Sequence, residues 1–117
     1  MYKTYGLTHV ALAVRDPERS LRFYQELAGF EPVYRRDDFI QAQTPGCRDI
    51  LVFQRDLEQA GKGGGILHFG FRLTDPADIE EAARAVERAG ARVSIMPENF
   101  HMRPMVNAIL EALDLEG

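Results

Sequence analysis

The sequence predicts an α+β fold built from two tandem β-α-β-β-β modules. Residues 7–17 and 66–76 carry the same pattern in the same register: alternating apolar residues, one histidine and a closing Asp-Pro pair. His9 and His68 occupy equivalent places in this repeat. An internal repeat indicates that one structural unit is used twice. The 117 residues, 45% of them hydrophobic, are enough for a single packed domain.

Charge and composition exclude several classes of partner. The formal net charge is −4 and no run of Lys or Arg stands out, so we expect no nucleic-acid partner. The N-terminus lacks the apolar core of a signal peptide, and nowhere do about 18 apolar residues run together, so we expect no membrane partner and a cytoplasmic location. Cys47 is the single cysteine and lies in a turn-like segment, where a thiol without a nearby base is usually inert.

The first module, residues 5–55, opens with a strand and a helix. Residues 7–14 alternate in polarity, which is typical of a strand with two different faces. Asp16 is a good N-cap with proline directly after it, and Gly29 suits the left-handed position that ends a helix. Three short apolar segments follow and are predicted as strands: residues 30–34, 39–43 and 50–54.

The two faces of the first strand differ in size as well as polarity. Large side chains at positions 10, 12 and 14 match the apolar stripe of the helix and predict a core. His9, Ala11 and Ala13 lie on the other face. Small residues beside a polar one leave room, so this face is predicted to line a cavity.

Residues 56–65 are predicted to be a linker, because they are charged and then glycine-rich. A phosphate-binding loop would need a helix after it, whereas a strand pattern follows here. The second module, residues 66–117, repeats the plan: residues 66–73 alternate, Asp75 and Pro76 begin a helix, and residues 91–95 form a strand. Together the modules make one domain, residues 1–117.

The C-terminal segment has two interpretations. Val106, Ile109, Leu110 and Leu113 have the i, i+3, i+4, i+7 spacing of a helix, and this pattern favours a helix after Pro104. In the alternative, which the resemblance described next implies, residues 109–113 form a late strand. Either way, the second module is expected to be atypical or incomplete at its C-terminal end.

Residues 7–24, Leu-Thr-His-Val-Ala-Leu-Ala-Val-Arg-Asp-Pro-Glu-Arg-Ser-Leu-Arg-Phe-Tyr, resemble the opening of the vicinal oxygen chelate superfamily. This superfamily includes glyoxalase I, extradiol dioxygenases, fosfomycin-modifying enzymes and bleomycin-resistance proteins. The resemblance implies that the two modules form a cupped mixed sheet around a divalent metal ion (Fe, Mn, Ni or Zn), often in a homodimer. It implies that His9 and His68 are metal ligands.

Two departures from the superfamily pattern bear on the metal site. The segment matching the fourth strand, residues 50–54, has no carboxylate where glyoxalase I has a glutamate ligand. The remaining option, two histidines and one carboxylate, takes the carboxylate from the last strand. Glu111, Asp114 and Glu116 are the late acidic residues, and none matches the motif.

The predicted function is that of a metal-dependent enzyme of lyase, isomerase or dioxygenase type acting on a small oxygenated molecule. The alternatives are a metal-free small-molecule binding protein of the bleomycin-resistance type and a variant with a vestigial metal site. No catalytic residue is assigned. Arg72 either holds an anionic substrate group or lies at the rim, and Phe53 either stacks on a substrate ring or, as we favour, fills the core. His101 has no repeat partner and is predicted to be a loop residue.

Overall fold

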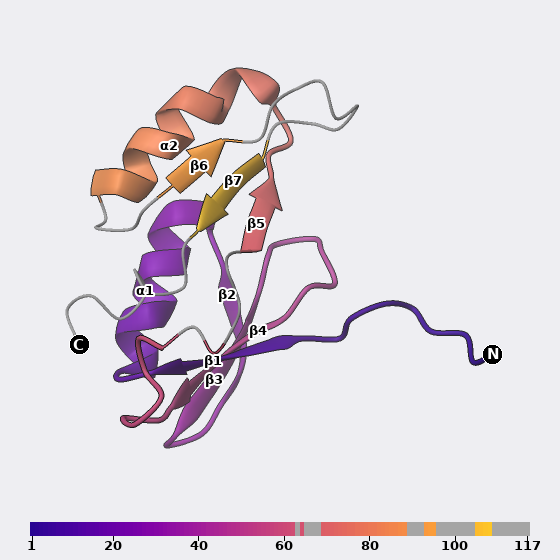
Figure 1. Cartoon of the computed structure of the whole chain (residues 1–117), viewed down its shortest axis with the longest axis vertical. Helices are drawn as coiled ribbons and strands as arrows, with labels where there is room; N and C mark the ends of the chain where they lie inside the picture. Colours follow the sequence, from indigo (N-terminus) through magenta and orange to yellow (C-terminus); the bar gives the residue numbers. More distant parts are fainter. Residues whose placement is uncertain (63, 65–68, 89–92, 96–104, 109–117) are drawn as a thin grey trace. The chain divides into compact units, whose positions relative to one another are not determined.

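The computed structural model describes residues 1–62, 64, 69–88, 93–95 and 105–108, which form two compact units. The boundary between the units lies between Ala60 and Gly61, inside the stretch predicted as a linker. In the described part of the chain, each unit has one sheet and one long helix (Figure 1). No helix among these described residues is long and apolar enough to cross a bilayer.

The first unit confirms the predicted β-α-β-β-β order. Its elements are β1 (Val10–Val14), α1 (Pro17–Ala28), β2 (Glu31–Arg35), β3 (Phe39–Gln43) and β4 (Leu51–Arg55). The sheet has the order β1-β4-β3-β2. β1 and β4 run parallel, and the other two pairs run antiparallel. The first nine residues are exposed, and Figure 1 shows this segment running away from the sheet.

Helix α1 begins and ends at the predicted residues. Asp16 is the N-cap, and its Oδ1 accepts hydrogen bonds from the backbone N–H groups of Glu18 and Arg19 at 3.1 and 3.4 Å. Gly29 has φ 70°, the left-handed conformation, and its N–H donates to the carbonyl of Gln25 at 2.9 Å. Both ends therefore satisfy backbone groups that the helix itself leaves unpaired.

The core of the first unit lies between α1 and one face of the sheet. Leu12, Phe53 and Ile40 stand in one row across β1, β4 and β3 and are almost completely buried. Tyr24 of α1 stacks on Phe53, with ring centroids 5.2 Å apart. The predicted division of β1 into a core face and a second face is confirmed by the burial of Leu12 and Val14.

The second unit has the predicted order of a strand followed by a helix, with helical structure beginning at Pro76. Its described elements are β5 (Phe69–Arg72), a 3₁₀ turn (Pro76–Asp78), α2 (Ile79–Arg88), β6 (Val93–Ile95) and β7 (Met105–Ala108). The sheet order is β5-β7-β6, and both pairs are antiparallel. Ala83 and Val86 of α2 are buried.

The predicted helix after Pro104 is wrong for residues 105–108, which form β7. This strand is the central one of its sheet: Val106 lies opposite Phe71 of β5 and Ile95 of β6. Hydrogen bonding on both edges outweighs a weak local helix propensity, which is worth only tenths of a kcal/mol per residue. Residues 109–113, which the alternative interpretation made a strand, lie outside the described residues.

Candidate functional site

The face of the first sheet away from α1, here called the distal face, carries the candidate site. The strand register places Ala13, Gln54 and Phe39 side by side in one row on this face. Side chains alternate along a strand, so His9 and Ala11 share the face with Ala13. The sequence predicted these three β1 positions together, and it missed the neighbours that β4 and β3 bring beside them.

A shallow cavity of about 210 Å³ lies at the carboxyl end of β1 and β4. It is lined by Ala11, Leu12, Ala13, Gln54 and Asp56. The two alanines contribute the small side chains from which the sequence predicted a cavity on this face. Its polar groups are the Gln54 amide and the Asp56 carboxylate, and both residues are exposed.

Asp56 is held in place by the backbone around it. Its N–H donates to the carbonyl of Val14 at 3.0 Å, which ties the end of β4 to the end of β1. Its Oδ1 accepts from the N–H groups of Glu58 and Gln59 at 3.2 and 3.1 Å. No salt bridge to Asp56 is formed among the described residues. The carboxylate is thus fixed while its negative charge has no cationic partner in that part of the chain.

An aromatic pair lies on the strands next to the cavity. The rings of Tyr34 and Phe39 have centroids 5.7 Å apart, and the Arg36 guanidinium carbon lies 5.9 Å from the Phe39 centroid. Tyr34 is 50% exposed. Since Phe39 stands directly opposite Gln54 in the register, the aromatic pair and the cavity are neighbours on the distal face.

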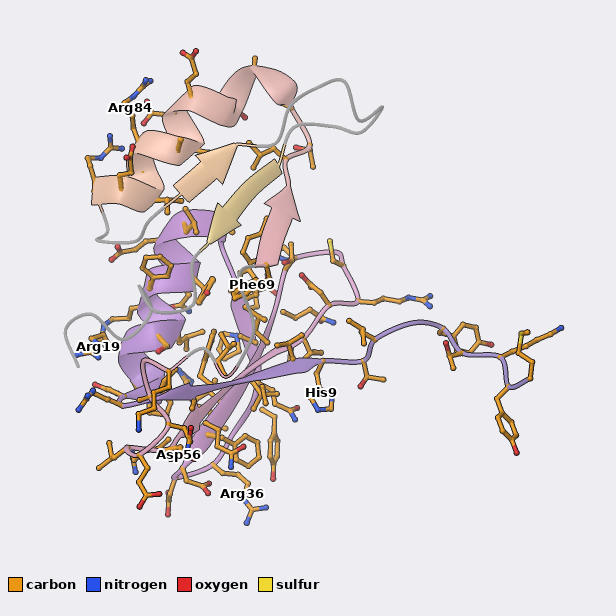
Figure 2. All side chains as sticks on the ribbon, in the orientation of Figure 1. His9, Arg19, Arg36, Asp56, Phe69 and Arg84 are labelled. Carbon is orange, nitrogen blue, oxygen red and sulfur yellow. The ribbon has the colours of Figure 1, made fainter. Side chains whose placement is uncertain are left out.

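His9 lies at the other end of β1, just before Val10, and it is exposed. Figure 2 shows His9 and Asp56 toward opposite ends of this strand. The Nδ1 atom of His9 is 2.8 Å from the Thr8 hydroxyl oxygen. When Nδ1 carries the proton and donates to that oxygen, the lone pair is on Nε2, which is the form that binds a metal ion.

The described residues fit only part of a metal site. His9 contributes one imidazole with an orienting hydrogen bond. Within the described ranges, no three His, Cys, Asp or Glu side chains are placed to share a metal ion. His68, the predicted second ligand, lies outside the described residues, as do His101 and the late acidic residues Glu111, Asp114 and Glu116.

The two predicted substrate-binding residues differ in position. Phe53 is completely buried and packs against Tyr24, so the structure places it in the core, the position that we favoured. Arg72 ends β5 opposite Met105 of β7, and the role of its side chain stays a prediction. Cys47 is exposed in the loop between β3 and β4.

Gln54, Asp56, Tyr34 and Phe39 were not predicted as site residues. Gln54 belongs to the segment 50–54, which lacks the ligating carboxylate of glyoxalase I, and Asp56 falls in the predicted linker. One signal in the sequence could have identified Asp56, namely its position directly after the predicted strand 50–54. Asp16 has a similar position, one residue beyond the end of β1. The aromatic pair carries no local signal, because the register that brings Phe39 beside Gln54 is a tertiary property.

A comparison with protein families gives a match over residues 6–108 to the Glyoxalase/Bleomycin resistance protein/Dioxygenase superfamily. An uncharacterized protein of Pseudomonas aeruginosa is 29% identical over 96 residues, which cover 74% of this chain and 67% of that protein. A probable trivalent organoarsenical cleaving enzyme of Bacillus subtilis is 27% identical over 84 residues, covering 70% of this chain. The aligned part spans only 55% of the Bacillus protein's length.

Three solved structures show the same fold. An integron cassette protein from the mobile metagenome of Halifax Harbour Sewage Outfall has a TM-score of 0.67 and 23% identity, covering 95% of this chain and 94% of its own. A bleomycin resistance determinant encoded on the transposon Tn5 has a TM-score of 0.61 and 18% identity, covering 93% and 92%. A lactoylglutathione lyase from Agrobacterium tumefaciens has a TM-score of 0.57 and 19% identity, covering 81% and 78%.

Proposed function

Because the chain belongs to the Glyoxalase/Bleomycin resistance protein/Dioxygenase superfamily, we propose that it is a metal-dependent enzyme acting on a small oxygenated molecule. His9 and His68 are the proposed metal ligands. The observation that carries the proposal is the environment of His9: Thr8 engages Nδ1, and the next residue on the same face of β1, Ala11, is small. The sequence repeat gives His68 the equivalent place in the second module.

A divalent ion held by these residues supplies Lewis-acid stabilisation of charge that develops on substrate oxygens. The chain's own residues do the positioning. The Thr8 hydroxyl orients the His9 ring, and Ala11 and Ala13 leave room for a substrate along β1. The Gln54 amide offers one donor and one acceptor group to a bound molecule. Two of the similar proteins are named as enzymes, a probable trivalent organoarsenical cleaving enzyme and a lactoylglutathione lyase.

Metal uptake by single-histidine variants tests this proposal. His9→Ala and His68→Ala should each lower bound metal from about one equivalent to nearly none, because one remaining imidazole cannot retain the ion. The measurement is metal content after incubation with Fe, Mn, Ni or Zn followed by dialysis. His101→Ala is the matched control and should retain full uptake.

Two outcomes would contradict the metal site. One is wild-type protein that retains none of the four metals. The other is an equal loss of metal in all three histidine variants, which would show that uptake does not depend on the repeated pair.

A second candidate function is metal-free binding of a small molecule. The exposed Gln54 amide and the Tyr34–Phe39 ring pair on the distal face favour it. Amides bind ligands by hydrogen bonds and aromatic rings bind them by stacking, and neither interaction requires a metal. The structural relative encoded on Tn5 is a bleomycin resistance determinant. Ligand binding that persists in a metal chelator distinguishes this function from the first. A homodimer and a cytoplasmic location stay predictions.

A further inference from the structure

We infer that the cavity on the distal face, together with the neighbouring Tyr34–Phe39 pair, binds small amines in which a planar ring is joined by a short chain to an ammonium group. This inference rests on the second candidate function, metal-free binding of a small molecule, because it names the ligand class for the same face of the sheet. It concerns the end of β1 opposite His9, where the cavity lies between Ala13, Gln54 and Asp56.

The charge of the cavity selects for a cation. Asp56 is the one charged residue among those that line it. Two backbone N–H groups hold Oδ1 and fix the carboxylate, and none of the described residues donates a hydrogen bond to Oδ2. A charge-assisted hydrogen bond from an ammonium group to a preorganised carboxylate is stronger than a neutral one. The Gln54 amide oxygen is a second acceptor at the same place.

The aromatic pair selects for a ring. Phe39 stands opposite Gln54 across β3 and β4, and Asp56 follows Gln54 by two residues, so a ligand bound beside Asp56 and Gln54 has its other end near the pair. The Arg36 guanidinium carbon lies 5.9 Å from the Phe39 centroid, so a ligand ring contacts the free edge of the pair or displaces this side chain. Aromatic pairs prefer offset or edge contacts and gain from them beyond the area they bury.

The size of the cavity limits the ligand. At about 210 Å³ it is smaller than the pockets of roughly 300–1,000 Å³ that hold drug-sized molecules. Ala11 and Ala13 set this size, because longer side chains at these positions would occupy the space. A single ring with a short aminoalkyl chain is therefore a better match than a fused-ring system.

Binding of phenethylamine to the full chain tests the inference. The protein is first treated with a chelator, and binding is followed by NMR shifts of backbone amides. The amine should shift residues 11–13 and 54–56, whereas 3-phenylpropionate, an anion of similar size, should bind at least about tenfold more weakly. Equal binding of the two probes, or shifts confined to other residues, would overturn the inference.

The chain offers a matched pair of variants. Asp16 and Asp56 each accept two backbone N–H groups through Oδ1, and only Asp56 lines the cavity. Asparagine keeps the accepting oxygen and removes the charge. Asp56→Asn should weaken phenethylamine binding about tenfold or more, and Asp16→Asn should leave it unchanged. An equal effect of both substitutions would overturn the inference.

A steric variant provides an independent measurement. Ala13→Leu fills the cavity without removing a charge and should also abolish the shifts at residues 54–56, while unchanged binding would overturn the inference. The variant His9→Ala separates this inference from the metal proposal, because it should keep amine binding while losing metal uptake. Amine binding without metal uptake supports the cavity and refutes the metal site, and the reverse result refutes the cavity alone.

Discussion

Asp16 and Asp56 show how two residues with the same local contacts acquire different roles. Each follows a strand and caps the turn or helix that comes next. The capping contacts of both follow from local sequence, because short acidic side chains compete well for free backbone N–H groups. Asp56 lies beside the gap left by alanines on the neighbouring strand and lines the cavity on the distal face, whereas Asp16 is not among the residues that line this cavity.

Ionisation of Tyr24 should have a clear effect on how the free energy of unfolding depends on pH. It is completely buried between α1 and the sheet, and burial raises the pKa of its phenol well above the usual value. The folded state therefore favours the neutral form, whereas the unfolded chain ionises near a pKa of about 10. The stabilisation that comes from keeping Tyr24 neutral is fully present below this unfolded-state pKa and is lost as the pH rises above it.

Tyr24→Phe removes this dependence. Between about pH 10 and about pH 11, wild-type stability should fall by up to about 1.4 kcal/mol more than that of the variant. Guanidinium unfolding of both proteins across this range measures the difference. The exposed tyrosines are the same in both proteins, so their contributions to the pH dependence cancel in the comparison: Tyr2, Tyr5 and Tyr34. If the free energies of unfolding of the two proteins fell in parallel as the pH rose, Tyr24 would not be responsible for the loss of stability at alkaline pH.

At the scale of elements, α1 was the best predicted part of the chain. Its boundaries depend on Asp16 and Gly29, whose preferences act within a few residues. A Cβ at Gly29 would meet only the Pro45 side chain at 3.9 Å, which is ordinary contact. The glycine is therefore required by its φ of 70° rather than by space.

Gly29→Ala should consequently destabilise the protein by about 1 kcal/mol, the cost of placing a side chain in the left-handed region. Gly29→Asn should cost less, because asparagine tolerates this conformation. Thermal or denaturant unfolding ranks the three proteins. Equal losses for alanine and asparagine would mean that something other than the backbone conformation is responsible.

The segment around β7 shows the opposite case. Of the apolar residues that suggested a helix, only Val106 falls in the described strand. Its neighbours Met105 and Ala108 have no strong β preference. The strand forms because it completes hydrogen bonding with β5 on one edge and β6 on the other, and neither partner is near it in the sequence.

At the scale of the whole molecule, two compact units each have their own sheet and helix. A destabilising substitution in one sheet should therefore lower hydrogen-exchange protection first within its own unit. Val106→Pro removes a backbone donor from the central strand of the second sheet and should cost at least about 2 kcal/mol. Hydrogen exchange should show lost protection in β5, β6 and α2, with protection retained in β1–β4 and α1.

Val106→Thr is the control, because it keeps the backbone donor and a β-branched side chain. It should leave the exchange pattern close to that of the wild type. A uniform loss of protection across both units in Val106→Pro would show that they unfold as one cooperative body.

The sequence by itself determined the α+β class, the repeated modules, the ends of α1 and the two faces of β1, because periodicity and capping act over short distances. It also paired His9 with His68, a pairing that the metal experiment must test. Only the tertiary structure decided that residues 105–108 form a strand and that Gln54 and Phe39 stand beside Ala13. These outcomes depend on register and packing between distant segments, and no local pattern encodes them.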